Sequence, residues 1–419
     1  NNTKAFRQVF RRFVYLLKEW NLIEGKTIAI DSFKIRASNS LKNNFNEKKL
    51  KRQLQYIDDQ ITEYEAQLDA CDKEEEKNEI QQKIDKRKNQ KTKYEDIRKE
   101  LGNSNEEQIS LTDPDSRAVV LHRNIVNVGY NIQASSDDKY KLLVEFDTGS
   151  VNDTHALATM AKQTKDLLGV ETMDVLADKG YHTGEQIKEC GENNITTYVS
   201  PKAPSTKDRG LYPVTAFDYN KENDTYTCPQ GCQMHTNGKW YKHSENRKGR
   251  RGGYHFQRYT TTACKTCKSR HLCTQSKVNG RAIDRSEYAG VIEANSKRVK
   301  GNPDYYRQRQ QVTEHMFGTM KRQQGFTHTL LRGRDKVLGE VGLMFIGYNL
   351  MRCISILGAK ELINALNRSI YQIFLLQEGL FLGFLSHFLF SKEKSWSEKT
   401  LAFKSTELIQ MRKLVYIYD

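Results

Sequence analysis

Two short apolar runs, each ending in an aspartate, constrain the fold of this chain more than any other feature. Residues 26–31 read Lys-Thr-Ile-Ala-Ile-Asp, and residues 173–178 read Met-Asp-Val-Leu-Ala-Asp. Their length and β-branched character predict buried strands, which deliver Asp31 and Asp178 at their C-terminal ends. Because open α/β sheets bind ligands at the C-terminal ends of their strands, the two carboxylates converge if these strands are neighbours.

The segments around these runs predict a mixed sheet. Residues 3–19 predict an amphipathic basic helix. Residues 128–133 and 141–146 predict two antiparallel strands, with a polar turn at 135–138 between them. Helices are predicted at 153–168 and 183–190, and a final strand at 195–199. Asp153 or Thr154 is the expected N-cap of the first of these helices. We therefore predict an α/β fold with a ribonuclease H-like mixed sheet and helices on both faces.

Two stretches depart from this core. In residues 46–101, apolar residues recur in steps of three and four from Leu50 to Leu68, which predicts an inserted helical hairpin. A solvated spacer is the plainer interpretation of this arm. Residues 201–300 are rich in Cys, Tyr and basic side chains and form a second predicted insertion.

The predicted domains follow from these observations. They are an N-terminal helical region expected to be a truncated remnant (1–24), the first part of the α/β core (25–45), the helical hairpin (46–110), more core (111–200), the Cys-rich, zinc-ribbon-like insertion (201–300), the remaining core (301–360) and a C-terminal helical tail (361–419).

A long helical pattern begins near Asp304 and continues through Lys321. Val312, Met316 and Met320 form an apolar stripe along it. Glu314 therefore lies on the opposite face, together with Arg307 and Lys321. A surface helix with salt bridges would show the same pattern.

Three convergent carboxylates suit metal-dependent chemistry on a phosphodiester. Two divalent ions about 4 Å apart activate the attacking oxygen and stabilise the leaving one, and Mg²⁺ prefers carboxylate ligands. Asp31, Asp178 and Glu314 are the candidates. Taken singly, each aspartate is equally an ordinary strand-end residue that caps a turn.

Together these segments resemble the DDE transposases of bacterial insertion sequences, in the branch with a Tyr-Arg-Glu-Lys signature. The matching stretches are residues 28–32, 176–181 and 306–321. The resemblance covers roughly residues 25–355, including the Cys-rich insertion before the glutamate.

The resemblance implies that Asp31, Asp178 and Glu314 bind Mg²⁺ or Mn²⁺ as a catalytic triad. A metal-activated water would cut double-stranded DNA at the ends of the element, and the freed 3′-hydroxyl would attack a second phosphodiester in the target. The expected setting is a homodimer on DNA in the bacterial cytoplasm, associated with the nucleoid.

The remaining signature residues are expected to contact DNA near the cleaved strand. They are Tyr306, Arg309 and Lys321. Four residues separate Arg309 from Glu314, where the commonest form of the signature has three. Arg307, on the predicted Glu314 face, is therefore an alternative to Arg309.

The charge balance agrees with a polyanionic partner. Lys and Arg number 67 against 52 Asp and Glu, a net charge of +15. A basic solvated surface explains the charge equally well. Two alternative functions stay open: a catalytically inactive transposase-derived DNA-binding protein, and a nuclease of the same fold that does not rejoin DNA.

Five of the eight cysteines fall within residues 228–273. With no signal-peptide pattern we expect a reducing cytoplasm, where clustered cysteines indicate a metal before disulfides. Cys228 and Cys232, and Cys264 and Cys267, are spaced as the two pairs of a structural zinc site. The 31 residues between the pairs exceed the common spacing, and Cys273 leaves the four ligands open.

Basic and aromatic side chains surround this cluster and predict a surface for DNA. They are Lys239, Trp240, Tyr241, Lys242, Arg247, Arg250, Arg251, Tyr254 and Arg258. The apolar residues 374–390 are shorter than the ~20 residues of a membrane-spanning helix, so we expect a docking helix or a dimer contact and no membrane.

Overall fold

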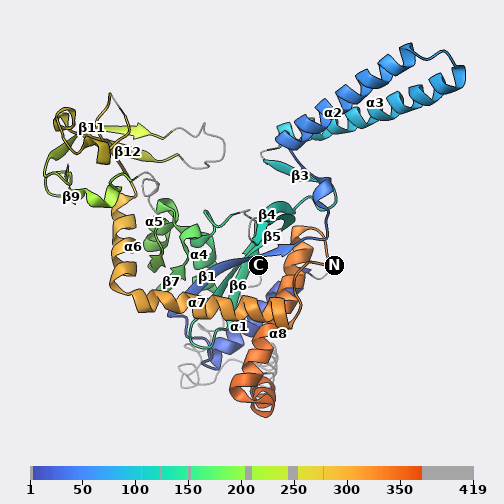
Figure 1. The fold of residues 1–419 in the computed structure, drawn as a ribbon. Coiled ribbons are helices and arrows are strands. Elements are labelled where there is room, and N and C mark those ends of the chain that lie inside the picture. Colours follow the sequence, from blue (N-terminus) through green and yellow to red (C-terminus); the bar gives the residue numbers. More distant parts are fainter. Residues whose placement is uncertain are drawn as a thin grey trace, which may run out of the picture. The chain divides into compact units, whose positions relative to one another are not determined.

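The computed structural model describes residues 3–104, 106–122, 125–149, 152–202, 210–243, 253–276 and 278–369 (Figure 1). The chain divides into two compact units, residues 1–352 and 353–419. The named helices are α1 (Thr3–Glu19), α2 (Glu47–Asp69), α3 (Glu74–Asn103), α4 (Leu157–Leu168), α5 (Gly184–Glu192), α6 (Ala289–Gly301), α7 (Pro303–Gly318) and α8 (Arg334–Leu357). Helical backbone is also present at 359–369.

The core of the first unit is a six-stranded mixed sheet. Its order is β4-β5-β1-β7-β8, and β6 also pairs with β5. β1 is antiparallel to β5 and parallel to β7, which is parallel to β8. The bounds are β1 (Thr27–Arg36), β4 (Arg117–His122), β5 (Ile125–Asp137), β6 (Leu143–Thr148), β7 (Met173–Ala177) and β8 (Ile195–Val199). The mixed α/β sheet predicted from the sequence is present.

Helices cover both faces of this sheet. The pairing of β1 with β5 puts Phe33 and Ser135 on opposite faces, because successive strand residues alternate. Thr164 of α4 contacts Ser135, with 2.7 Å between the two hydroxyl oxygens. On the other face, Phe317 and Phe345 from α7 and α8 have ring centroids 4.9 and 6.2 Å from that of Phe33.

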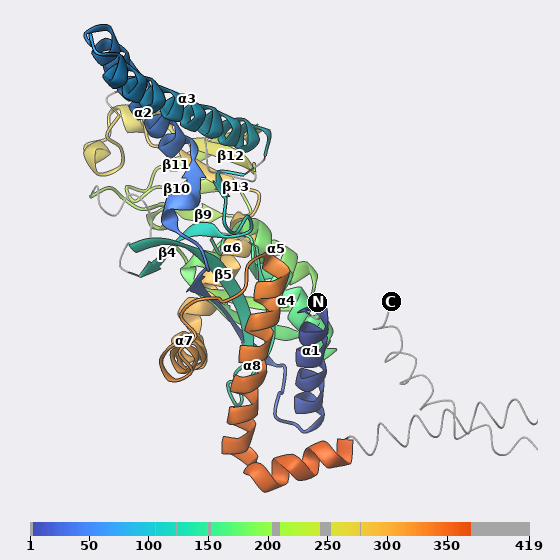
Figure 2. The same cartoon turned by 90° about the vertical axis from the view of Figure 1, so that its right-hand side faces the viewer.

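The basic N-terminal helix α1 lies beside α8 (Figure 2). The ring centroid of its Phe10 is 5.1 Å from that of Phe146 and 6.2 Å from that of Phe345. Arg7 and Arg11 donate to the fully buried carboxylate of Glu145. The helix predicted at 3–19 is confirmed, and these two arginines neutralise an internal charge.

Among the described residues, α8 alone has the length and composition to cross a membrane. Half of its apolar stretch (50%) is buried inside the protein. Core helices of soluble proteins meet the same two criteria, so length and composition alone do not make α8 a membrane span.

The predicted helical hairpin is present as α2 and α3, which run side by side (Figure 1). Leu50 of α2 and Ile97 and Leu101 of α3 are buried together with Phe45. At the base of the hairpin, the short strands β2 (Asn44–Asn46) and β3 (Gln108–Ser110) pair antiparallel.

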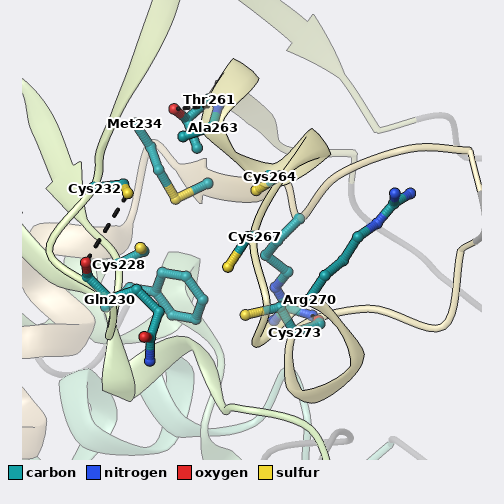
Figure 3. Close-up of a pocket in the computed structure, with 12 residues that line it drawn as sticks. Cys228, Gln230, Cys232, Met234, Thr261, Ala263, Cys264, Cys267, Arg270 and Cys273 are labelled. Carbon is teal, nitrogen blue, oxygen red and sulfur yellow. Dashed lines mark hydrogen bonds between the residues drawn. The ribbon is translucent and has the colours of Figure 1, made fainter.

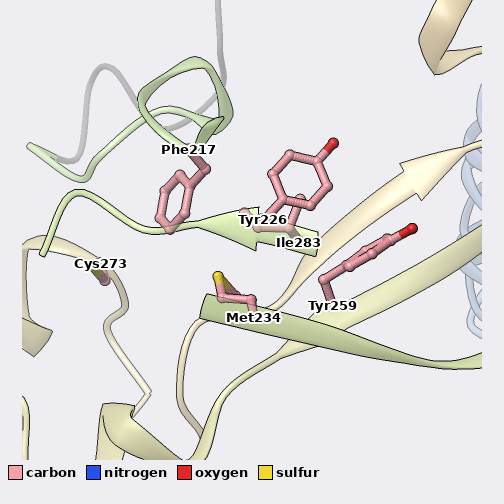
Figure 4. Packing of buried hydrophobic residues seen from close by; sticks show 6 residues of the cluster. All are labelled: Phe217, Tyr226, Met234, Tyr259, Cys273 and Ile283. Atoms are coloured by element: carbon pink, nitrogen blue, oxygen red, sulfur yellow. The ribbon is translucent and has the colours of Figure 1, made fainter. Parts of the chain in front are cut away.

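A second, five-stranded antiparallel sheet lies within the Cys-rich segment. Its order is β13-β12-β11-β10-β9. The strands are β9 (Asp218–Asn220), β10 (Thr225–Thr227), β11 (Gln233–Lys242), β12 (His255–Thr260) and β13 (Ile283–Ser286). Figure 4 shows its small core, formed by Phe217, Tyr226, Met234, Tyr259, Cys273 and Ile283.

Two sequence predictions about element ends are wrong. Asp31 does not end its strand, because residues 32–36 of β1 continue to pair with β5. Neither Asp153 nor Thr154 caps α4. That helix starts at Leu157, and Ala156 precedes it without a side-chain cap.

The helix predicted through Lys321 is also different. α7 ends at Gly318 and a π-helical turn follows at Thr319–Gln323. The predicted tail helix at 374–390, and Arg247, Arg250 and Arg251 of the basic surface, lie outside the described residues.

Candidate active site

The first two acids meet where β1 and β7 pair. The parallel register runs to the pair Ile30 and Ala177, and the next residue on each chain segment is an aspartate. Neighbouring strands lie about 4.8 Å apart, so Asp31 and Asp178 are adjacent. The expected convergence of these two residues is therefore present.

Asp31 is held on the face of the sheet that α7 covers. Its Oδ2 accepts from Nη1 of Arg309 at 2.9 Å, and its Oδ1 accepts from the backbone N–H of Ser32 at 2.8 Å. Burial raises the pKa of Asp31. The charge of Arg309 and the hydrogen bond from Ser32 lower this pKa, and the charge of Asp178 raises it. Burial has the largest effect, and the result is a pKa above the ordinary value.

Asp178 shares its surroundings with a third carboxylate, that of Asp153. The backbone N–H of Gly180 donates to Oδ1 of Asp178 at 2.7 Å. A Cβ at Gly180 would lie 2.9 Å from that oxygen and 3.3 Å from Oδ2 of Asp153, so both carboxylates close over the glycine. Oδ1 of Asp153 accepts from the buried amides of Asn131 (2.8 Å) and Gln133 (2.7 Å).

The sequence analysis missed Asp153 because an acid just before a helix is usually a cap. The available signal was the alternation of Asn131 and Gln133 in β5, where two polar side chains point to one face of a buried strand. Such amides need an acceptor, and Asp153 supplies it.

Tyr181 lies near enough to the three carboxylates to be affected by their charges. It is completely buried, and its hydroxyl donates to Oε1 of Gln133. Burial, followed by the charges of Asp153, Asp31 and Asp178, raises the pKa of Tyr181 well above its ordinary value. The phenol therefore stays protonated and remains a donor.

Glu314 is not part of this group. Val312, Met316 and Met320 are fully buried, as the apolar stripe predicts, and Glu314 is exposed on another side of α7. It makes no hydrogen bond or ion pair within the described ranges. Across those ranges, no three His, Cys, Asp or Glu side chains are arranged to hold a metal ion.

Two of the signature residues on α7 face the acids. Arg309 pairs with Asp31, whereas Arg307 is 75% exposed and pairs with Asp304 on the same helix. The hydroxyl of Tyr306 donates to the carbonyl of Ala177 at 3.3 Å, next to Asp178. The structure thus brings Arg309 to the acids, and not its alternative Arg307.

Lys321 lies in the π-helical turn, with its Nζ 5.6 Å from the ring centroid of Phe33. Burial and the charge of Lys34 lower the pKa of Lys321. The prediction that Lys321 shares the exposed face of Glu314 is wrong, because the π-helical turn changes the helical register between them.

The clustered cysteines lie apart from the acids, in the second sheet. All eight cysteines of the chain are free, and the five clustered ones line a cavity of about 20 Å³ (Figure 3). Nearby thiols, Cys228 first, raise the pKa of Cys232, and burial raises the pKa of Cys273. The thiols are therefore close to one another.

The basic and aromatic side chains of β11 and β12 differ in their availability. Trp240 is 54% exposed and Tyr241 is 36% exposed. Arg258 is engaged with Asp284, with Nε 2.7 Å from one carboxylate oxygen and Nη2 2.9 Å from the other. The two aromatic side chains are therefore better placed than Arg258 to contact a ligand.

Comparison with known proteins identifies one domain. Residues 227–354 match the family model of the transposase DDE domain, which supports a DDE transposase. Neither a curated protein nor a solved structure matches the chain. A domain of this family implies a DNA substrate, nuclease or transposase activity, a divalent metal ion as its usual cofactor and a ribonuclease H-like fold.

Proposed function

We propose that the chain is a transposase of a bacterial insertion sequence that cuts and rejoins DNA through Asp31, Asp178 and Glu314. The observation that carries the proposal is the adjacency of Asp31 and Asp178 at the β1–β7 junction. The family match is a second, independent support, because it rests on residues 227–354. That segment includes Glu314 and Lys321 and contains neither Asp31 nor Asp178.

The donor set fits Mg²⁺ or Mn²⁺, since carboxylate oxygens are the ligands that these hard cations prefer. Bound between the acids, the ions would activate the attacking oxygen and stabilise the leaving one. Asp31 and Asp178 already lie next to each other, as this role requires, and Arg309 forms an ion pair with Asp31.

Glu314 needs a movement of α7 to join the two aspartates. Thr313, its neighbour, is buried and lies on the side of Asp31, where its hydroxyl lowers the pKa of that acid. Successive residues of an α-helix point about 100° apart. The proposal therefore requires α7 to turn about its axis when the acids take up metal.

The side chains around the acids are suited to hold DNA. Arg309 and Lys321 offer cations to phosphate oxygens, and Tyr306 offers a hydroxyl beside Asp178. Arg307 is exposed and able to contact DNA at the rim of the site. The exposed Trp240 and Tyr241 of β11 add surfaces on which a base can stack.

The rest of the proposal concerns the reaction and its setting. Hydrolysis at the end of the element frees a 3′-hydroxyl, which then attacks the target strand without a covalent protein–DNA intermediate. We propose a homodimer that holds two DNA ends, in the cytoplasm of a bacterium. The helical hairpin and the Cys-rich sheet are proposed insertions in the catalytic core.

Cleavage of DNA that carries the ends of the chain's own element tests the proposal. We expect nicking with Mg²⁺ or Mn²⁺, and a joined product when supercoiled target is added. Asp31→Asn, Asp178→Asn and Glu314→Gln should each reduce nicking by more than about 100-fold, the upper range for residues that only support metal ligands.

Asp304→Asn is the matched control, because Asp304 is an exposed acid on the same helix as Glu314. Full activity of any one of the three acid variants would contradict the proposal, as would a trapped covalent adduct. Nicking without joining would identify a nuclease, and DNA binding without nicking would identify an inactive relative.

A further inference from the structure

The pairing of β11 with β12 explains why the clustered cysteines are so widely spaced. β11 begins directly after Cys232, and β12 ends four residues before Cys264. The two strands are antiparallel, and His235 pairs with Thr260. Strands β11 and β12, which lie between the two cysteine pairs in the sequence, form an antiparallel hairpin, and its end at His235 and Thr260 brings the pairs side by side.

Tight turns present the thiols at this open end. The backbone N–H of Cys228 donates to the carbonyl of Cys232 at 2.9 Å, and Gly231 donates back to Cys228 at 2.8 Å. Gly231 has φ +78°, which a side chain would strain. On the facing segment, Arg270 donates to the carbonyl of Cys267 at 3.3 Å. Turns of this kind hold cysteine pairs in structural metal sites.

Four of the five thiols are better placed than the fifth. Figure 3 shows the sulfurs of Cys228, Cys264, Cys267 and Cys273 directed into the cavity. Cys273 is 8% exposed and belongs to the core of the sheet. The thiol of Cys232 lies beside that of Cys228 at the edge of the cavity, and it donates to the carbonyl of Gln230 at 4.0 Å in an exposed turn.

The charges around the cavity favour bound thiolates. Arg270 and Arg281 both line it. The Nε of Arg281 is buried and has no hydrogen-bond partner within the described ranges, while its Nη1 donates to the carbonyl of Cys273 at 3.2 Å. A buried N–H of this kind needs an acceptor. A metal-bound thiolate beside Cys273 would supply one.

The small core of the second sheet also favours stabilisation by a bound metal ion. Six buried residues make up its core (Figure 4), and β9 and β10 have only three residues each. The segment from Thr262 to Cys273 contains only short 3₁₀ turns. Small domains with so little core are commonly stabilised by a metal or disulfides, and every cysteine here is free.

We propose that Cys228, Cys264, Cys267 and Cys273 bind one structural Zn²⁺ that fastens the open end of the β11–β12 hairpin, and that Cys232 is not a ligand. The sulfurs line the cavity without forming a ready group within the described ranges, so binding has to draw the two segments together. This inference does not depend on the proposed catalysis.

Metal content of the full chain, purified without chelators, tests the site. We expect roughly one zinc per chain and loss of zinc in Cys228→Ser, Cys264→Ser, Cys267→Ser and Cys273→Ser. Cys232→Ser is the matched control and should keep its zinc. Cys190→Ser, in α5 of the core, is a second control.

A cobalt measurement keeps the test valid if the serine variants do not fold. Co²⁺ added to the zinc-free wild-type chain should give the visible and near-ultraviolet bands of tetrahedral thiolate coordination, and the Cys232→Ser variant should give the same spectrum. A chain without zinc and without these bands would overturn the proposal. A disulfide within the cluster, or zinc loss in Cys232→Ser but not in Cys273→Ser, would overturn it as well.

Discussion

Arg309 holds the position beside Asp31 that a cation is expected to take. The side chains of Arg309 and Asp31 are only 15% and 22% exposed, so solvent screens their attraction little. Burial would otherwise leave the Asp31 carboxylate poorly solvated, and Arg309 offsets part of that effect. Before metal and DNA bind, the protein thus supplies its own counter-charge.

Replacing Arg309 should therefore strengthen metal binding in the absence of DNA. Even a solvent-exposed ion pair contributes up to about 1 kcal/mol, so Arg309→Ala should raise the affinity for Mn²⁺ at least about fivefold. Electron paramagnetic resonance of free Mn²⁺ measures this. Arg307→Ala is the control, because Arg307 contacts Asp304 only in an exposed pair. Equal affinities in the two variants would show that Arg309 does not compete with the metal.

Asp153 is the acceptor for two buried amides, and this role predicts a loss of stability when it is changed. In Asp153→Ala, the N–H donors of Asn131 and Gln133 lose their acceptor. A buried donor without a partner costs about 1–3 kcal/mol. Urea unfolding should show a loss in this range, whereas Asp304→Ala, at an exposed position, should change stability by less than about 0.5 kcal/mol. Unchanged stability of Asp153→Ala would contradict this role of the Asp153 carboxylate.

At the scale of elements, α8 forms side-chain hydrogen bonds with the backbone at the β6 edge of the main sheet. Asn349 is fully buried, and its side chain accepts from the N–H of Leu143 at 2.8 Å and donates to the carbonyl of Leu143 at 2.9 Å. Arg352 donates to the carbonyl of Tyr140 at 3.1 Å. These contacts satisfy backbone groups of β6 and of the turn before it that would otherwise lie unpaired at a sheet edge.

Removing the Asn349 side chain should loosen this edge. Asn349→Leu keeps the volume but leaves the N–H and carbonyl of Leu143 without partners, so we expect a loss of about 2 kcal/mol in the free energy of unfolding. Hydrogen exchange should locate the change at Leu143 in β6. Asn364→Leu, which loses one exposed contact to Glu361, should leave exchange in β6 as it is. Unchanged protection of Leu143 in Asn349→Leu would contradict the role.

At the scale of the whole molecule, the α2–α3 hairpin is the feature that can be removed most cleanly. Asn46 pairs directly with Gln108, so a two-residue turn can replace the chain between them. The core should stay folded without the hairpin. The hairpin is a candidate for the contact between the two chains of the proposed homodimer. If it carries that contact, light scattering on the DNA-bound variant should give one chain per DNA end without pairing of ends. Unchanged pairing would assign the contact elsewhere.

Strong periodic patterns made much of the fold predictable. The helices at 3–19 and 46–101, and strands β7 and β8, follow apolar patterns that leave little choice. The extension of β1 past Asp31 was missed, although residues 32–36 alternate polar and apolar side chains and Phe33 and Ile35 are buried. This alternation is the pattern of a half-buried strand.

The site was predictable in part for a similar reason. The two apolar runs that precede Asp31 and Asp178 locate these acids, because two buried strands of similar character are expected to pair in parallel. The apolar stripe of α7 predicts which face is buried and leaves Glu314 outside it, but no local pattern predicts the π-helical turn after Gly318, which separates Lys321 from Glu314. The position of Asp153 in the site depends on its contacts with Asn131 and Gln133 of β5, which are distant in the sequence.

The parallel pairing of β1 with β7 has a consequence for how freely this chain can vary. It closes a loop of 177 − 30 = 147 residues, of which the hairpin from Glu47 to Asn103 supplies 103 − 46 = 57. The entropy of closing a loop grows only with the logarithm of its length, about 0.6 kcal/mol per doubling. Lengthening the loop from 90 to 147 residues is less than one doubling, so the helical arm can change in size with almost no penalty to assembly of the two aspartates.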